Sequence, residues 1–272
     1  MKKAIRKEFQ KSQFNFQHDK PHDFAIFAWQ GDREKISGYF VFYRFLAAAF
    51  FLSVLVANGS ISETPTYFFI YLTNLGFIIQ TLHLVLSAAV PIEFLLQKSN
   101  DEDGVKWTFL GRFSWFLYNV TNLISLVISV IYWIALYTPG SGLTAMNFFV
   151  HGFNSIMSIG DILVSGRPCR LMHFYQPFVV ILAYVAFSAI YWAAGGVNSD
   201  GLSYIYPVLD WNNLSLTVPF VTIGLFVLLP IVHALLWSLH KFRDYALRSR
   251  IRRKSFSQPH SIGEQNPAFE LA

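Results

Sequence analysis

Residues 67–96 read YFFIYLTNLGFIIQTLHLVLSAAVPIEFLL, and this stretch decides the fold class. It exceeds the length of about 20 apolar residues that a helix needs to cross a bilayer. Polar side chains nevertheless interrupt it, namely Thr73, Asn74, Gln80, Thr81, His83 and Glu93. Polar groups in hydrocarbon are costly and usually face the interior of a helix bundle. The stretch therefore predicts a transmembrane helix with polar side chains turned toward other helices.

The composition of the whole chain is that of a membrane protein. Of its 272 residues, 54% are hydrophobic and 14% are charged, against about 25% charged in soluble domains. The apolar residues form blocks rather than a periodic pattern, which is typical of membrane spans. The predicted spans are 38–58, 67–96, 113–137, 146–165, 173–196 and 217–240. We therefore predict an all-α membrane protein, a bundle of six transmembrane helices.

The same blocks divide the chain into three parts. A basic N-terminal segment, 1–37, precedes the transmembrane domain, 38–240, and a basic C-terminal tail, 241–272, follows it. The chain has a single cysteine, Cys169, so no internal disulfide forms and a metal site with two cysteines is excluded. We expect no metal and no cofactor.

Basic residues alternate between the predicted loops. Lysine and arginine are absent from 59–66, 138–145 and 197–216, whereas 97–112, 166–172 and both tails contain them. Arg44 is the exception, because it lies inside the first span. Since cytoplasmic loops carry the excess of lysine and arginine, the pattern predicts that both termini are cytoplasmic. The basic residues flank membrane spans, which argues against nucleic-acid binding.

The fourth predicted span, 146–165, is the most polar of the six. It contains His151, Asn154 and Asp161, which a helix facing lipid would not tolerate. Without this span, Arg167 and Arg170 would lie outside and the alternation of charge would break. We therefore expect a central helix that is surrounded by protein.

The polar residues of the spans fall into two layers. At about 1.5 Å rise per residue, Thr73, His151 and Asn154 share a level in the outer half of the bilayer, with His151 and Asn154 on one helix face. A threonine hydroxyl is a weak nucleophile that needs an adjacent base, and a neutral imidazole can supply it. The pattern is compatible with acyl transfer. In the alternative, Thr73 bonds to its own helix and His151 to a neighbour.

The lower layer contains Arg44, His83 and Asp161. A lone charge at this depth is costly, so we expect Arg44 to pair with Asp161. We interpret these three residues as structural.

Both tails leave two interpretations open. In residues 1–37, phenylalanines alternate with basic residues, so the segment either lies on the membrane interface or packs under the bundle. The C-terminal tail, with KFRDYALRSRIRRKSFSQ at 241–258, either binds anionic lipid or only sets the topology.

The chain resembles the rolling stone proteins, within the wider androgen-induced-gene family of membrane proteins. The residues that carry the resemblance are Tyr43-Arg44, IYLTNLGFIIQ (70–80), HGFNSIMSIGDILVSGRPCRLMHFYQP (151–177), YWAAGG (191–196) and YIYPVLDW (204–211). The resemblance covers nearly the whole chain. It implies a multi-pass membrane protein associated with myoblast fusion, without an established chemistry.

The androgen-induced branch implies a different activity, a threonine hydrolase of fatty acid esters of hydroxy fatty acids. Its nucleophile lies in a Leu-Thr motif of the second span, which Leu72-Thr73 matches. Its base is the second histidine of a His-Gly-x-His motif, and that position is Asn154 here. An amide has no titratable nitrogen, so only His151 remains as a substitute base.

These observations favour a plasma-membrane protein that supports cell–cell fusion, with the intramembrane lipid-ester hydrolase as the alternative. A transporter or channel is a third class, but no pair of interrupted helices in matching halves indicates it. The expected surroundings are the lipid bilayer, of the plasma membrane or the endoplasmic reticulum, and the sequence names no protein partner.

Overall fold

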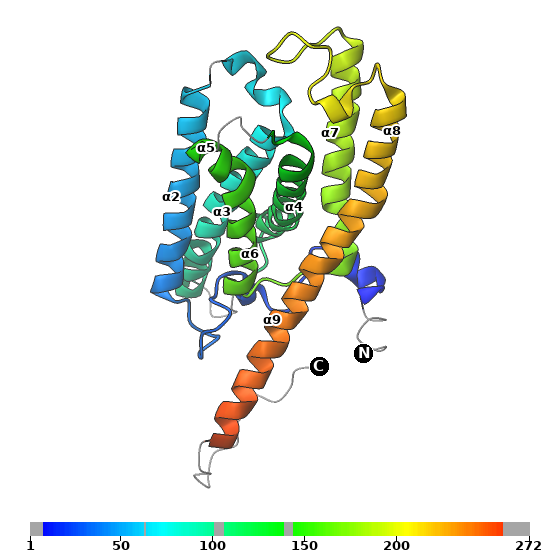
Figure 1. Cartoon of the computed structure of the whole chain (residues 1–272). Helices are drawn as coiled ribbons and strands as arrows, with labels where there is room; N and C mark the ends of the chain where they lie inside the picture. The colour runs from blue at the N-terminus through cyan, green and yellow to red at the C-terminus, as the bar shows by residue number, and fades with distance from the viewer. Residues whose placement is uncertain (1–7, 63, 101–105, 139–143, 258–272) are drawn as a thin grey trace.

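The computed structural model describes residues 8–62, 64–100, 106–138 and 144–257, and within these ranges the chain is helical without a strand. The α-helices are α2 (Gly38–Ser60), α3 (Leu72–Asn100), α4 (Phe109–Ile131), α5 (Ala145–Phe148), α6 (Asn154–Val164), α7 (Tyr175–Ala193), α8 (Leu214–Ile223) and α9 (Leu229–Ser257) (Figure 1). Short 3-10 turns cover Lys11–Phe14, Pro21–Phe24, Pro65–Ile70, Leu171–Phe174 and Pro207–Leu209.

Three π-helical turns continue or join these helices. Tyr132–Leu136 extends α4, Phe149–Phe153 joins α5 to α6, and Gly224–Leu228 joins α8 to α9. Such turns are rare and are often found at functional sites. In this chain they make three continuous helical segments: α4 with its extension, α5–α6 and α8–α9.

Within the described residues, five helical stretches are long and apolar enough to cross a membrane. They are Gly38–Ser60, Leu72–Gln97, Phe109–Leu136, Leu171–Ala193 and Leu214–Arg250. Each overlaps a predicted span. The remaining predicted span, 146–165, is helical through α5, the π-turn and α6, but it is not one of these five. The chain is therefore an all-helical protein with several apolar spans, as predicted.

The helix α4 lies at the centre of the bundle. It packs against α3 and α6 on one side and against α7 and α9 on the other, and Figure 1 shows α7 and α8–α9 standing apart from the group formed by α2 to α6. Its side chains Trp115, Tyr118 and Leu123 are buried in the main apolar cluster. The apolar residues of α4 thus hold the two groups of helices together.

The polar segment α6 is amphipathic rather than fully enclosed. Asn154, Ser158 and Asp161 are buried, whereas Ile156 and Ile159 are exposed. The prediction of a central helix surrounded by protein is therefore wrong. A spacing of three to four residues places all the polar side chains on one helix face, so α6 can bury this face and leave an apolar face toward lipid.

The N-terminal segment packs under the bundle. Its backbone pairs with the end of α6, since the amide of Ala28 donates to Val164 O at 2.8 Å and that of Gly166 donates to Ile26 O at 3.1 Å. Phe24 is fully buried and contacts the rings of Trp107 and Trp115. For the described residues 8–37, the structure therefore agrees with packing under the bundle rather than with a segment free on the membrane interface.

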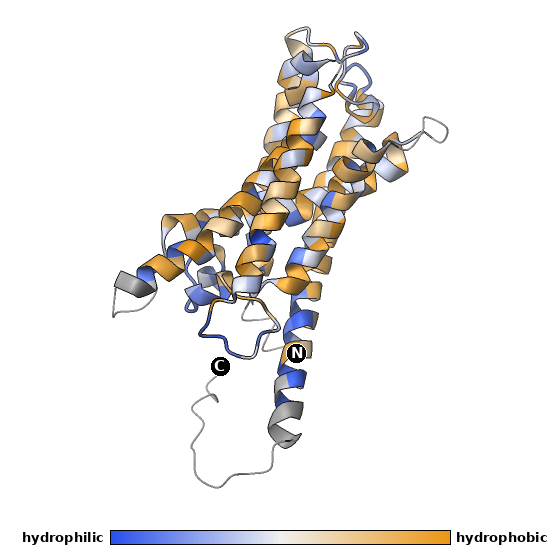
Figure 2. Ribbon diagram, turned by 90° about the vertical axis from the view of Figure 1, so that its left-hand side faces the viewer, coloured by the Kyte–Doolittle hydropathy of each residue, from blue (hydrophilic) through white to orange (hydrophobic). Residues whose placement is uncertain are grey.

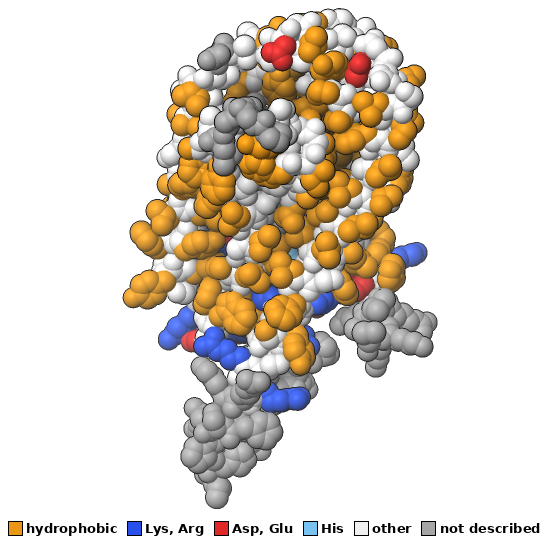
Figure 3. All heavy atoms as spheres, viewed as in Figure 1, with side chains coloured by type: hydrophobic (Ala, Val, Ile, Leu, Met, Phe, Trp, Pro, Cys, Tyr) orange, Lys and Arg blue, Asp and Glu red, His pale blue; other side chains and the backbone are white. Residues whose placement is uncertain are grey.

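The two ends of the bundle differ in charge. In the face drawn in Figure 3, lysine and arginine side chains gather at the end where the N-terminal segment lies, and the far end shows acidic side chains without basic ones. The part of α9 that extends past this basic end is mostly hydrophilic where it is coloured in Figure 2. The helix α9 runs without a break across residue 240, the predicted end of the transmembrane domain. Lys241, the first residue after it, forms an ion pair with Glu8 at 2.7 Å through its Nζ atom.

Candidate functional site

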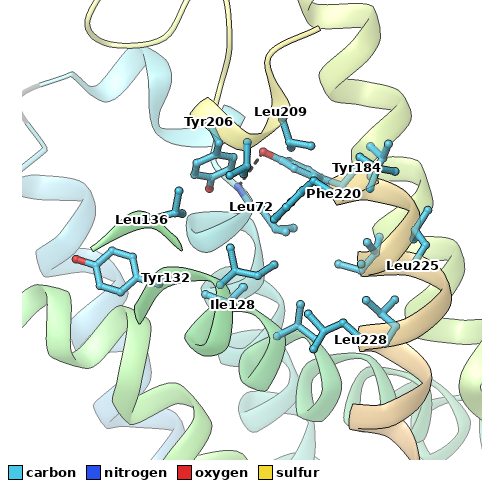
Figure 4. A pocket seen from close by; sticks show the side chains of 18 of the residues that line it. Leu72, Ile128, Tyr132, Leu136, Tyr184, Tyr206, Leu209, Phe220, Leu225 and Leu228 are labelled. Carbon is cyan, nitrogen blue, oxygen red and sulfur yellow. Dashed lines mark hydrogen bonds between the residues drawn. The ribbon is translucent and has the colours of Figure 1, made fainter. Parts of the chain in front are cut away.

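Two neighbouring cavities meet in the half of the bundle away from the N-terminal segment. An apolar cavity lies between the start of α3, the end of α4, α7 and the α8–α9 rod (Figure 4). A more polar cavity, open to the surroundings, lies between α3, the end of α4 and α5. Thr73, Tyr132, Leu136 and Tyr206 line both cavities. Thr73 therefore stands where an apolar space adjoins a polar one.

Thr73 lies in the first turn of its helix, not deep within it. The chain forms a 3-10 turn over Pro65–Ile70 and α3 begins only at Leu72, five residues after the start of the predicted span 67–96. The amide groups of a first helical turn have no partner within the helix. Here the amide of Leu72 donates to Tyr184 Oη at 3.2 Å (Figure 4) and that of Thr73 donates to Tyr206 Oη at 3.4 Å.

The hydroxyl of Thr73 shares a hydrogen bond with a tyrosine from a distant part of the chain. Thr73 Oγ1 lies 3.4 Å from Tyr206 Oη, in the loop between α7 and α8. Burial raises the pKa of Tyr206, although its hydrogen bonds with Thr73 lower it, so the phenol stays neutral and can donate or accept. The positive end of the α3 dipole also points at this position and favours negative charge there.

His151 lines the polar cavity together with Thr73. It belongs to the π-turn between α5 and α6, and its ring stacks on Tyr132 with centroids 3.5 Å apart and planes at 1°. Its carbonyl accepts a hydrogen bond from Ser129 Oγ, and its buried Nδ1 has no partner among the described residues. Among the described residues, no hydrogen bond joins Thr73 to His151. Both therefore face one space without forming a preassembled pair.

Asn154 does not reach this space. Its side chain is 2% exposed, and its Oδ1 accepts hydrogen bonds from Ser129 Oγ at 3.3 Å and from the Ser155 amide at 2.7 Å. Gln80 Nε2 donates to its backbone oxygen at 2.9 Å. The expectation that His151 and Asn154 share one face toward Thr73 is wrong, because the π-turn changes the helical phase between them.

The lower layer lies elsewhere in the bundle. The predicted ion pair between Arg44 Nη1 and Asp161 Oδ1 is present, and both side chains are at most 2% exposed. His83 Nε2 lies 3.3 Å from Asp161 Oδ2, and Ser87 Oγ lies 3.4 Å from His83 Nδ1. These contacts tie α2, α3 and α6 together and do not extend to Thr73.

Three of the tyrosines that line the site, Tyr132, Tyr184 and Tyr206, had no predicted role. Tyr132 and Tyr184 could have been identified from the sequence, because a phenol inside an apolar span requires a hydrogen-bond partner. Tyr206 lies in the stretch YIYPVLDW, which carries the family resemblance. Within the described residues, no group of three His, Cys, Asp or Glu side chains could hold a metal ion.

The site can accommodate an amphipathic molecule. The first cavity has an apolar lining and the second a more polar one, as the two parts of such a molecule require, and Thr73 lines both. A hydroxyl at a helix N-terminus, near a neutral imidazole and a phenol, has the elements of acyl transfer.

Comparisons with known proteins give one consistent answer. The family model described as protein rolling stone matches residues 1–264. The protein rolling stone of Drosophila melanogaster is 31% identical over 277 residues, which cover 96% of each chain. No solved structure matches. Because the family model covers almost the whole chain and the relative matches 96% of it, this chain belongs to the rolling stone family.

Proposed function

We propose that this protein crosses the membrane six times with both termini in the cytoplasm. Five apolar spans support the proposal, together with the helical segment 145–164 and the charge of the loops. The N-terminal segment and the end of α9 lie at the same end of the bundle (Figure 1), as an even number of crossings requires. An acceptor site for N-glycosylation placed in the loop 197–216 should be modified in cells, and one introduced into 166–172 should not. The reverse pattern would contradict the topology.

We propose that the two cavities bind a lipid ester. The observation that carries the proposal is the position of Thr73 at their junction. The acyl chain occupies the apolar cavity, and the ester group lies beside Thr73 Oγ1 with its alcohol portion toward His151. The family resemblance supports fatty acid esters of hydroxy fatty acids as the substrate class.

The reaction that fits this arrangement is hydrolysis through an acyl-threonine. Thr73 Oγ1 attacks the ester carbonyl, its proton passes to His151, and the bond to the alcohol oxygen breaks as the alcohol takes up that proton. Water then cleaves the acyl-threonine and releases the fatty acid. The phenol of Tyr206, which accepts from the amide of Thr73, donates to the oxyanion, the role that such donors play in acyl transfer.

Labelling with a fluorophosphonate probe tests the chemistry. We expect the purified wild-type protein to be labelled and the Thr73→Ala variant to lose the label. Thr81→Ala is the matched control, because Thr81 is on the same helix and its hydroxyl donates to Phe77 O at 2.8 Å. Equal labelling of wild type and Thr73→Ala would remove Thr73 from the mechanism.

A second candidate is a role in cell–cell fusion without catalysis, at the plasma membrane. It is favoured by the burial of Asn154 away from the cavity and by the bond of Thr73 with Tyr206 instead of His151. The family resemblance supports the same role. Here the lipid is bound and not cleaved, and folded wild-type protein is not labelled. Removal of the protein from fusing cells should reduce fusion, and Thr73→Ala should restore it fully; fusion unaffected by removal would refute this role.

A further inference from the structure

Arg167 is a buried cation without a hydrogen-bond partner. It follows α6 in the short connection to α7, and its side chain is 0% exposed. Its Nε, Nη1 and Nη2 atoms all lack an acceptor. The guanidinium carbon lies 5.9 Å from the ring centre of Phe24 and 5.5 Å from that of Tyr118. Two aromatic faces at these distances do not replace the hydrogen bonds that a buried charged group requires.

A second buried arginine shares this deficit. Arg44 uses Nη1 to pair with Asp161, but its Nε and Nη2 have no acceptor. Arg167 lies in the same region, because the ring of Tyr118 lies 5.5 Å from its guanidinium carbon and 5.6 Å from the ring of His83, and His83 and Arg44 both contact Asp161. Arg44 also lowers the pKa of Arg167. Burial is the larger cause, and together they bring this pKa to about 9, so that Arg167 remains charged at neutral pH. Five guanidinium nitrogen atoms therefore lack acceptors in one region of the bundle.

The charges in this region do not balance. Among the described residues, the buried cations are Arg44, Arg167 and Arg243 and the buried carboxylates are Asp161 and Glu8. Glu8 pairs with Lys241. Arg243 donates to the carbonyl groups of Ile162, Ser165 and Arg167 and to the carboxylate of Asp244. Asp161 is left to neutralise both Arg44 and Arg167, so one positive charge remains without a counter-charge.

We propose that the unpaired N–H groups of Arg167 and Arg44 hold one small monovalent anion, for which chloride is the probe. Ordered water could accept these hydrogen bonds but would leave the excess charge in place. A lipid headgroup is excluded by size, because both side chains are fully buried and Phe24 of the N-terminal segment packs beside Arg167. The anion thus joins α2 to the connection after α6, against which Phe24 of the N-terminal segment packs.

Thermal unfolding of the full-length protein in detergent tests the site. The sodium salts of chloride, bromide and the much larger gluconate are compared at one ionic strength. We expect the melting temperature of the wild type to rise with chloride or bromide and to saturate, because a ligand that binds only the folded state stabilises it. Arg167→Met should abolish this rise, and Arg248→Met, which changes an exposed arginine on α9, should keep it.

Two results would overturn the proposal. One is a melting temperature of the wild type that does not depend on the anion, which indicates that water fills the site. The other is an unchanged chloride dependence in Arg167→Met, which places the anion elsewhere. If Arg167→Met does not fold, anomalous scattering from bromide in crystals of the wild type decides: a peak between Arg44 and Arg167 supports the site, and no peak at saturating bromide refutes it.

Discussion

At the scale of single residues, Tyr206 is the side chain that connects the outer loop with the candidate nucleophile. Its phenol bonds both the amide and the hydroxyl of Thr73. We expect Tyr206→Phe to lower fluorophosphonate labelling of Thr73 roughly fivefold, since one hydrogen bond contributes about 1 kcal/mol and about 1.4 kcal/mol is a factor of ten in rate. Tyr191→Phe is the control, because Tyr191 bonds Val197 O instead. Equal labelling in both variants would show that Tyr206 does not position Thr73.

The buried pair of Arg44 and Asp161 gives a second prediction at this scale. Asp161→Asn removes the carboxylate and leaves Arg44 charged and unpaired in the interior, which costs about 3–5 kcal/mol in comparable buried pairs. We expect a loss of this size in the free energy of unfolding, measured by denaturant titration in detergent. Asp32→Asn serves for comparison, since the side chains of Asp32 and its partner Lys35 are 54% and 83% exposed and its loss should cost about 1 kcal/mol at most. Similar losses in the two variants would contradict the importance of the buried pair.

At the scale of elements, α6 is attached to α4 by small polar residues. Ser155 Oγ lies 2.6 Å from Ser129 Oγ and donates to Ser125 O at 2.8 Å. Small residues at such interfaces allow close packing of helices in membranes. Ser155→Leu should lower the free energy of unfolding by about 1–3 kcal/mol, the usual cost of overpacking. Ile156→Leu, on the adjoining exposed face, should be neutral; a comparable loss there would indicate that α6 packs differently.

At the scale of the whole molecule, the N-terminal segment closes one end of the bundle, and Asp23 helps to hold it in shape. Burial raises the pKa of Asp23, but hydrogen bonds with His18 and Arg33 outweigh it, so the pKa is lowered from its ordinary value of 3.8. A lowered pKa stabilises the folded state above the unfolded value, and this stabilisation is lost as the pH falls through the folded value.

The measurement compares the wild type with Asp23→Asn across pH. The free energy of unfolding should differ above about pH 4 and should converge as the pH falls below 3.8. Asp32→Asn is the control, because the side chain of Asp32 is 54% exposed and lies 3.8 Å from Lys35. A difference between wild type and Asp23→Asn that persists unchanged at low pH would exclude the carboxylate as its source.

Features that depend on local composition follow from the amino-acid sequence alone. Apolar blocks longer than about 20 residues become membrane-spanning helices, and a charge within them requires a partner, so the pair of Arg44 and Asp161 could be predicted. Only the tertiary structure decided where the site lies. The start of α3 at Leu72, the π-turn that separates His151 from Asn154, and the contact of Tyr206 with Thr73 depend on packing between distant segments. For the same reason Arg167, one basic residue among several in a short loop, is identified as buried only when the N-terminal segment folds over it.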